Sequence, residues 1–426
     1  MCSSDLNFDN PNGSPEVIVP ADGNAVYAAW AAARYPVEDI FFVADKPFVQ
    51  IETSRGCPMK CFYCTSGNTH IRYRSIDQVQ TELRLLSDKG VKEVRVLDRT
   101  FNLPQSRAIE LLQLFRMQFP EMKFHLELHP QFLDEPLREE LTRALPGQLH
   151  IEAGIQCLDP VVQEFSGRCS NINDLLDGLK FLCEQQAFVT HADLLAGLPG
   201  QRLENIIDDT ARLMQLNTAE IQLEVLKVLP GTPLRKIAAE HGIKYNPSAP
   251  YDVMQSNTAS MEDLQYARDL SRLLDMTYNH QFLHHAVWLM NRDCPDMVRK
   301  LLAFFHNAGG NASVLWDLKK RFLFLLEFCK THQLADVCCE LAWQWLLAGY
   351  PQQQGPDEYS CKAQTIPSEA RHISGNPAAW GARESRYWSF VMAGKTYFLA
   401  YNRQYALNRP AGIWVLEEDN CKNTVG

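Results

Sequence analysis

Three cysteines, Cys57, Cys61 and Cys64, lie within eight positions of the stretch ETSRGCPMKCFYCTSG at residues 52–67. Thiolates at this spacing on one short loop suit an iron–sulfur cluster, whose iron atoms prefer soft sulfur ligands. A structural zinc site is the alternative, but it usually adds a second C-x-x-C or histidine pair, and none is apparent nearby. The loop therefore favours a 4Fe–4S cluster with three protein ligands. An iron without a protein ligand would be available to a substrate or a cofactor.

The elements that must position this loop follow a repeated pattern between residues 47 and 230. Apolar runs rich in β-branched residues alternate with amphipathic stretches, which predicts six parallel strand–helix units. The expected strands lie at 47–54, 91–101, 123–130, 148–156, 189–198 and 219–230. The cysteine loop follows the first strand, and active sites of parallel α/β folds lie at the carboxyl ends of the strands. Periodicity alone fits either a doubly wound sheet or a partly closed barrel.

The rest of the chain predicts three further segments. Residues 1–46 read as a lead-in segment and 47–245 as the core, while long helical stretches predict a helical module over 246–350. Residues 351–426 begin with a Pro/Gln/Gly-rich linker and end in a small β element. In that element, RYWSFVMAGKTYFLAYN predicts a hairpin with Ala393, Gly394 and Lys395 at the turn.

Composition narrows the class of protein. The chain is 46% hydrophobic and 22% charged, which is typical of a globular fold. A net charge of −10 argues against a broad nucleic-acid surface. There is no apolar run of about 18 residues and no secretion signal, so we expect a cytoplasmic protein with no membrane span. In a reducing compartment, thirteen cysteines indicate metal binding or chemistry rather than disulfides.

The pattern C-x3-C-x2-C, with Tyr63 before the third cysteine, resembles the radical S-adenosylmethionine (radical SAM) superfamily. The resemblance implies a partial (β/α)6 TIM-like barrel in which Cys57, Cys61 and Cys64 bind a 4Fe–4S cluster. It also implies that the fourth iron chelates S-adenosylmethionine (SAM), with Tyr63 packing near the adenine. Enzymes of this superfamily reductively cleave SAM to a 5′-deoxyadenosyl radical. The expected function is therefore radical SAM catalysis on a substrate that the residues do not identify.

The resemblance continues along the later strands. Four positions match SAM-binding residues of the coproporphyrinogen-oxidase-like branch, namely Glu127, Gln156, Arg168 and Asp193. Arg168 is implied to pair with the SAM carboxylate, as a bidentate cation would. The second strand departs from the family's glycine-rich motif, because here the chain reads VLDRTFN. Asp98, with Thr100 and Asn102, offers the polar groups at that position.

Longer phrases, such as THADLLAGLPGQ and APYDVMQSNTASMEDL, resemble one bacterial branch of the superfamily over about residues 40–285. Its members usually carry an N-terminal cobalamin-binding domain, the radical SAM core and a C-terminal domain of unknown function. Only 56 residues precede Cys57 here, fewer than the roughly 100 that a cobalamin domain needs. We therefore expect that this domain has been lost or that the sequence is a fragment. Cobalamin-dependent methyl transfer is not assigned.

Lys227 and Tyr251 are weak candidates for contact with the substrate. The structural alternative is that Lys227 makes an ion pair and Tyr251 packs a loop against the barrel. Histidines, including His125, His191 and His284, are expected to be ordinary core or surface residues. The implied partners are a small-molecule or peptide substrate and a reductant such as flavodoxin or ferredoxin. Two alternatives stay open: an iron–sulfur electron-transfer or redox-sensing protein that does not cleave SAM, and a catalytically idle scaffold.

Overall fold

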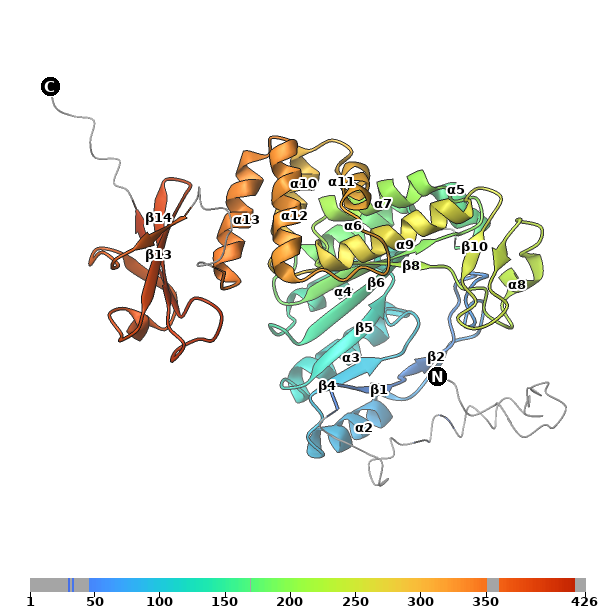
Figure 1. The fold of residues 1–426 in the computed structure, drawn as a ribbon. Helices are drawn as coiled ribbons and strands as arrows, with labels where there is room; N and C mark the ends of the chain where they lie inside the picture. Colours follow the sequence, from blue (N-terminus) through green and yellow to red (C-terminus); the bar gives the residue numbers. More distant parts are fainter. Residues whose placement is uncertain (1–29, 31–32, 34–45, 169, 351–359, 418–426) are drawn as a thin grey trace, which may run out of the picture. The chain divides into compact units, whose positions relative to one another are not determined.

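The computed structural model describes residues 30, 33, 46–168, 170–350 and 360–417 (Figure 1). The described chain forms two compact units. The first unit runs up to Gly154 and includes Asn173–Val189, and the second comprises Ile155–Ile172 and the residues from Thr190 onward. Most of the expected lead-in, 1–46, lies outside the described residues. The expected domain boundaries at 245 and 350 stay a prediction.

The first unit is built on parallel strands with helices between them. Parallel pairing joins β1 to β4, β4 to β5 and β5 to β6. The strands are β1 (Val49–Ile51), β4 (Glu93–Val96), β5 (Lys123–Leu128) and β6 (Leu149–Gln156). The helices are α2 (Ile76–Asp88), α3 (Gln105–Gln118), α4 (Glu135–Thr142) and α6 (Ile172–Cys183), with a 3₁₀ turn η1 (Pro130–Phe132).

Local sequence signals set these elements. Ser75 and Gln78 form a reciprocal capping box that starts α2, in which each side chain accepts a hydrogen bond from the other's backbone N–H. Burial alternates along β5 and β6, so one face of each strand is apolar and the opposite face is polar. On the apolar side, Phe115 of α3 stacks on Phe124 of β5 with ring centroids 3.9 Å apart. A short antiparallel pair, β2 (Ser54–Arg55) and β3 (Arg72–Tyr73), brackets the cysteine loop.

The second unit continues the pattern with β7 (Val189–Ala196) parallel to β8 (Glu220–Val225). Its first helices and short strands are α5 (Pro160–Phe165), α7 (Leu203–Gln215), α8 (Pro233–Ile237), β9 (Lys244–Tyr245) and β10 (Val253–Gln255). The order of the six parallel strands is β1-β4-β5-β6-β7-β8, so the sheet is open between its end strands. This arrangement confirms the expected α/β class with six strand–helix units.

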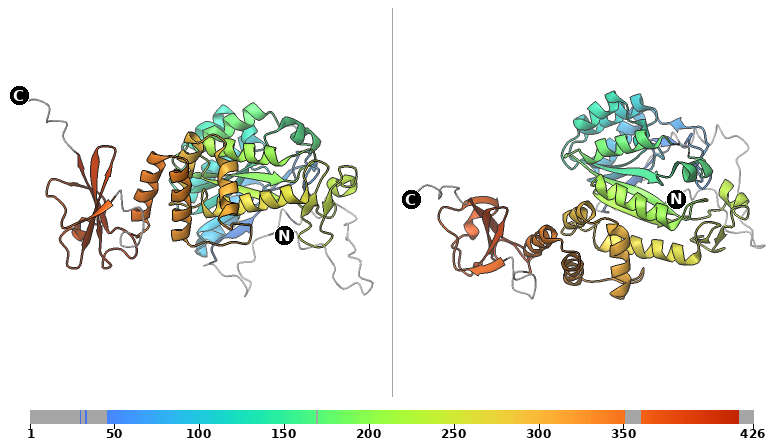
Figure 2. Two further views of the ribbon diagram at one scale, coloured as in Figure 1. Left: turned by 45° about the horizontal axis from the view of Figure 1, so that its top comes forward. Right: turned by 90° about the horizontal axis from the view of Figure 1, so that it is seen from above.

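A helical region follows in the second unit (Figure 2). Its helices are α9 (Met261–Met276), α10 (His284–Asp293), α11 (Met297–Asn307), α12 (Leu318–Thr331) and α13 (Ala335–Leu347). Edge-to-face aromatic pairs hold α11 against α12: the ring centroids of Phe305 and Phe324 lie 6.1 Å apart, and Trp316 contacts both rings. Of the helices that the structure describes, none is both long enough and apolar enough to cross a membrane.

A five-stranded antiparallel sheet ends the described chain, in the order β11-β13-β14-β15-β12. The strands are β11 (Ser360–Ala363), β12 (Arg371–Gly375), β13 (Arg386–Met392), β14 (Lys395–Tyr401) and β15 (Gly412–Glu417), with a 3₁₀ turn η2 (Pro377–Ala379). Ala393 and Gly394 form the β13–β14 turn with φ of 51° and 72°, as expected, whereas Lys395, which was also expected in the turn, begins β14 and pairs with Met392. Buried Leu346 of α13 and Phe390 of β13 belong to one apolar cluster.

Candidate functional site

The cysteine loop lies between β2 and β3 in the first unit. Cys57 and Cys61 are each 6% exposed, and Cys64 is half-buried. Hydrogen bonds between Cys57 and Thr69 close the loop: Thr69 N donates to Cys57 O at 2.8 Å, and Cys57 N donates to the Thr69 hydroxyl oxygen at 2.9 Å. A further bond from Cys64 N to Cys61 O, at 3.1 Å, shapes the turn between the last two thiols. Three sulfur donors on one closed loop fit a cluster with three protein ligands.

Two glycines allow the loop to close. Gly56 has a φ of +107°, and a Cβ there would lie 2.4 Å from the carbonyl oxygen of His70. A Cβ at Gly67 would lie 2.6 Å from the carbonyl oxygen of Cys61. Both distances are shorter than any real contact. Only glycine fits at these two positions, because another part of the backbone lies against each of them.

Asp98 holds the chain that leads into the loop. It follows β4, is 2% exposed and accepts hydrogen bonds from Thr53 N at 2.7 Å and Ser54 N at 2.9 Å. The Thr53 hydroxyl also donates to this carboxylate. Burial raises the pKa of Asp98, although these donors partly oppose the shift. The carboxylate thus positions the backbone just before the cysteines, and its contact with SAM stays a prediction.

Thr100 and Asn102, from the same segment, also have partners in the structure. Thr100 Oγ1 lies 3.4 Å from Cys57 Sγ and donates to Arg99 O at 2.7 Å. Burial raises the pKa of the Cys57 thiol, and the contact with Thr100 partly opposes this shift. Asn102 is fully buried and accepts from His129 N while donating to His129 O, both at 2.9 Å. It therefore joins the segments that follow β4 and β5.

Two further predicted residues belong to the first unit. Glu127 lies near the carboxyl end of β5, with its Oε1 3.8 Å from Arg99 Nη1. Its side chain is 26% exposed, so it is neither a buried structural carboxylate nor a fully solvated one. Tyr63 is half-buried beside Cys64 in the loop. The positions of both residues are compatible with a role next to the cysteine loop.

In the second unit, Gln156 ends β6 with a φ of +70°, which is unusual for a residue other than glycine. Arg168 follows α5 and is 8% exposed, and its N–H donates to Gln163 O at 2.9 Å. Gln163 Nε2 in turn donates to Cys157 O at 2.6 Å. Gln163 therefore ties the Arg168 segment to the chain directly after Gln156. Sequence reasoning did not find Gln163, although a buried glutamine in a short helix is a usable signal.

Asp193 lies on β7 of the same unit. Its Oδ1 is 3.7 Å from His191 Nε2. The turn after β7 contains Gly197 and Gly200, with φ of +94° and +82°. Gln201 Oε1 accepts from Gly197 N at 2.8 Å and holds this turn. The positive φ angles of these two glycines permit the geometry of this turn.

The weak substrate candidates have structural partners. Lys227 Nζ lies 3.6 Å from Glu224 Oε2, and the Lys227 side chain is 43% exposed. The guanidinium carbon of Arg235 lies 5.3 Å from the Tyr251 ring centroid and 5.4 Å from the Tyr245 ring centroid. These contacts match the structural alternative, in which Lys227 makes an ion pair and Tyr251 packs a loop. A substrate role for Lys227 or Tyr251 stays a prediction.

Asp209 of α7 is a second polar residue that sequence reasoning missed. Its Oδ2 accepts from Leu158 N at 2.9 Å, just beyond β6. Burial raises the pKa of Asp209 to about 6. A carboxylate on the apolar side of an amphipathic helix, next to Ile206 and Leu213, was the available signal.

The fold is an open parallel α/β sheet with a three-cysteine loop after its first strand, and residues 51–213 match the model of the radical SAM superfamily. More particularly, residues 239–344 match the model of a protein family of unknown function, DUF4080. The chain therefore carries a radical SAM domain followed by a DUF4080 region. This composition confirms the branch that the sequence resembled, and the DUF4080 match covers most of the expected helical module.

Curated relatives are similar to part of the chain. One is an uncharacterized methyltransferase of Pyrococcus horikoshii, 26% identical over 204 residues that cover 46% of this chain and 43% of that protein. Another is a tryptophan 2-C-methyltransferase of Streptomyces laurentii, 24% identical over 237 residues that cover 52% of this chain and 39% of that protein. The chain thus spans about two fifths of the length of these relatives.

Solved structures also match part of this chain. The radical SAM methyltransferase TsrM of Kitasatospora setae, solved with tryptophan and a SAM analog, has 19% identity and a TM-score of 0.42, covering 49% of this chain and 43% of that one. The cobalamin-dependent radical SAM enzyme OxsB, solved with aqua-cobalamin and SAM, has 12% identity and a TM-score of 0.41, covering 69% of this chain and 55% of that one.

Proposed function

We propose that this chain is a radical SAM enzyme that cleaves SAM reductively to a 5′-deoxyadenosyl radical, which then acts on a substrate still to be identified. The observation that supports this most directly is the closed loop of Cys57, Cys61 and Cys64 within the radical SAM domain. Its three thiols would hold a 4Fe–4S cluster. When bound, this cluster supplies one electron and an iron that chelates SAM.

The chain's own residues have distinct tasks in this proposal. Asp98 fixes the backbone at Thr53 and Ser54, so the loop starts from a defined position. By the resemblance, Glu127, Gln156 and Asp193 accept hydrogen bonds from SAM, and Tyr63 packs near its adenine. Arg168 pairs with the SAM carboxylate, and at 8% exposure this pairing would be little screened by water.

Methyl transfer is a second candidate activity, because both curated relatives described above are named methyltransferases. Cobalamin is the cofactor that this branch uses for such transfer. The two activities differ in their SAM-derived product. Radical cleavage yields 5′-deoxyadenosine, and loss of the SAM methyl group yields S-adenosylhomocysteine, so the second product marks methyl transfer. The proposed partners are a small-molecule or peptide substrate and a protein reductant such as flavodoxin or ferredoxin.

The test is anaerobic reconstitution with iron and sulfide, followed by dithionite and SAM, with and without cobalamin. We expect 5′-deoxyadenosine from the parent protein and none from Cys61→Ala. Cys183→Ala, which removes a half-buried thiol outside the loop, is the matched control and should retain activity. A cluster that is reduced while SAM stays intact would instead support the electron-transfer alternative.

A further inference from the structure

One side chain from outside the cysteine loop reaches a sulfur atom of the loop. Thr100 Oγ1 lies 3.4 Å from Cys57 Sγ, at a distance suited to a hydrogen bond with sulfur. Thr100 and Cys57 are 5% and 6% exposed, so water competes little for this contact. The proposed function assigns Cys57 to the cluster and leaves the Thr100 hydroxyl without a task.

The backbone of the loop also donates to its sulfur atoms. Ser66 N donates to Cys64 Sγ at 3.4 Å, and the Met59 backbone donates to Cys57 Sγ. In both bonds the donor lies two positions after the cysteine, so the local fold of the loop accounts for them. Thr100 instead lies in the segment after β4, and tertiary structure brings it to the sulfur. A single side-chain substitution can therefore remove this donor and leave the loop sequence unchanged.

The segment that carries Thr100 is anchored on both sides. After it, Phe101 N donates to Glu127 O at 2.9 Å and joins the segment to β5. Before it, Asp98 accepts a hydrogen bond from Ser54 N at 2.9 Å, in the chain that enters the cysteine loop. The hydroxyl is thus held next to the sulfur by contacts that do not depend on the hydroxyl itself.

The hydroxyl is the donor of the pair once Cys57 binds a metal. A cysteine that ligates a cluster is a thiolate and carries no proton, so its sulfur can only accept. Thr100 Oγ1 also lies 2.7 Å from Arg99 O, and these two acceptors share one hydroxyl proton. A hydrogen bond to a charged acceptor is roughly twice as strong as one to a neutral acceptor, which favours donation to the thiolate.

A hydrogen bond to a ligand sulfur changes the reduction potential of an iron–sulfur cluster. Reduction adds negative charge to the iron and sulfur atoms. A donor at the sulfur therefore stabilises the reduced state more than the oxidised state, which raises the potential. A higher potential makes it easier for a protein reductant to deliver the electron that SAM cleavage requires.

We propose that the Thr100 hydroxyl donates a hydrogen bond to Cys57 Sγ and thereby raises the reduction potential of the cluster held by the loop. Thr100 acts through Cys57, so it is a positioning residue that tunes the cluster. The inference rests on the proposed function in one respect, because it takes the loop thiols as cluster ligands.

The test compares Thr100→Val, which removes the hydroxyl, with Thr100→Ser, which keeps it. Each full chain is reconstituted anaerobically with iron and sulfide and titrated with dithionite without SAM, and the EPR signal of the reduced cluster gives the midpoint potential. At a fixed potential, the ratio of reduced to oxidised cluster in Thr100→Val should be about tenfold lower than in the parent. This ratio corresponds to a midpoint about 59 mV lower. Thr100→Ser should stay close to the parent.

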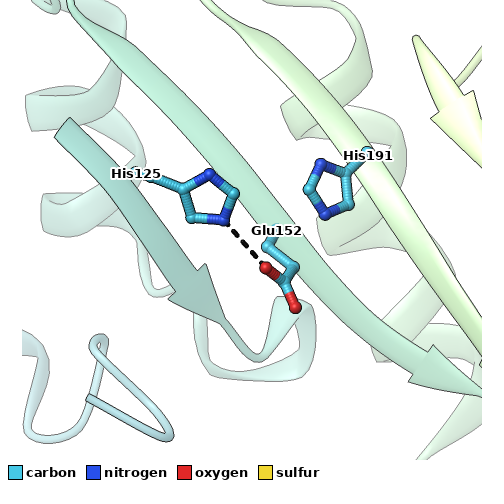
Figure 3. A group of neighbouring side chains, drawn as sticks. All are labelled: His125, Glu152 and His191. Atoms are coloured by element: carbon cyan, nitrogen blue, oxygen red, sulfur yellow. Dashed lines mark hydrogen bonds and ion pairs between the residues drawn. The ribbon is translucent and has the colours of Figure 1, made fainter. Parts of the chain in front are cut away.

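Two controls change polar groups away from the loop. Thr210→Val removes a fully buried hydroxyl that donates to Ile206 O at 2.8 Å in α7. His125→Gln changes a side chain on the sheet of the first unit, where His125 Nε2 lies 2.8 Å from Glu152 Oε2 (Figure 3). Both variants should keep the midpoint potential of the parent.

An unchanged potential in Thr100→Val would overturn the proposal, and so would an equal shift in Thr100→Val and Thr100→Ser. If Thr100→Val binds no cluster, Thr100→Ala takes its place. Loss of the cluster from both variants would show that the hydroxyl serves assembly and would also overturn the proposal. Because SAM is omitted, a parent that forms no 5′-deoxyadenosine contradicts the proposed function and leaves this measurement intact. A parent that binds no 4Fe–4S cluster contradicts both.

Discussion

At the residue scale, buried carboxylates position the backbone around the candidate site. Asp98 accepts two backbone N–H groups directly before the cysteine loop, and Asp209 accepts one directly after β6. Their pKa values are raised mainly because burial disfavours the charged form. Such carboxylates order the chain, but keeping them ionised while buried costs free energy, and this cost disappears when they are protonated.

We predict that Asp98→Ala destabilises the fold. The substitution leaves the N–H groups of Thr53 and Ser54 buried without their acceptor, and each such group costs about 1–3 kcal/mol. The free energy of unfolding, measured with urea, should fall by at least that amount. Asp88→Ala, at an exposed aspartate, is the control and should change it little. An unchanged value for Asp98→Ala would mean that water replaces the carboxylate.

Asp209 predicts a pH dependence of stability. Its pKa is about 6 in the folded protein and near the ordinary 3.8 when unfolded, so the folded state binds its proton more tightly. This group therefore makes stability fall as the pH rises from about 4 to about 6, by at most about 3 kcal/mol. In Asp209→Asn this part of the pH dependence should vanish from urea unfolding curves.

The neighbouring Asp208 provides the control for this experiment, because it is exposed on the same helix. Asp208→Asn should keep the pH dependence of the parent protein. If Asp209→Asn and the parent lose stability equally between pH 4 and 6, the carboxylate of Asp209 titrates normally and the cause lies elsewhere.

At the scale of elements, the cysteine loop and the terminal hairpin show how short segments reach a defined shape. In the loop, one backbone hydrogen bond and one to the Thr69 hydroxyl join Cys57 to Thr69 and close the turn, and glycines permit the close approach. In the hairpin, positive φ at Ala393 and Gly394 matches the twist of β13 and β14. Both segments were predictable because their determinants are adjacent in sequence.

We predict that Gly67→Ala impairs loading of the cluster. A methyl group would overlap the carbonyl oxygen of Cys61, so the backbone must move and displace the thiols. Iron and sulfide per chain after anaerobic reconstitution should fall clearly below the parent value. Ser66→Ala is the control, because the hydrogen bonds that Ser66 makes within the loop come from its backbone. Equal iron content in Gly67→Ala would show that the loop can adapt.

At the scale of the whole molecule, the terminal sheet is joined to the helical region through α13. Tyr401 Oη donates to Leu346 O at 2.7 Å, and burial raises the pKa of Tyr401. Leu346, Phe390 and Leu399 form an apolar cluster around this contact. The sheet therefore packs on the last helix rather than standing apart from it.

We predict that Tyr401→Phe lowers the free energy of unfolding by about 1–2 kcal/mol, because the buried carbonyl of Leu346 loses its donor while the aromatic packing remains. Differential scanning calorimetry measures the effect. Tyr397→Phe, on the same strand but only half-buried, should change little. An equal loss in both variants would show that the hydrogen bond itself contributes nothing specific.

The sequence by itself determined the class of fold and the cysteine loop. Three features were predictable from residues close together in the sequence: the strand–helix alternation, the thiol spacing and the Ala393–Gly394 turn. In each of them the local backbone geometry restricts which residue types fit. The sequence underestimated the terminal sheet, which was expected only as a small β element at the end of residues 351–426. β11 and β12 are short edge strands, and β12 contains serine and glycine, so neither shows a clear strand pattern.

Only the tertiary structure decided which distant polar groups meet. Asp98 accepts the backbone N–H groups of Thr53 and Ser54, more than 40 residues earlier in the chain, and its contact with SAM stays a prediction. Strand register places His125 opposite His150, and His125 Nε2 lies 2.8 Å from Glu152 Oε2. The spacing of residues within one segment cannot predict such contacts, because the register between strands about 25 residues apart is set by packing of the whole sheet.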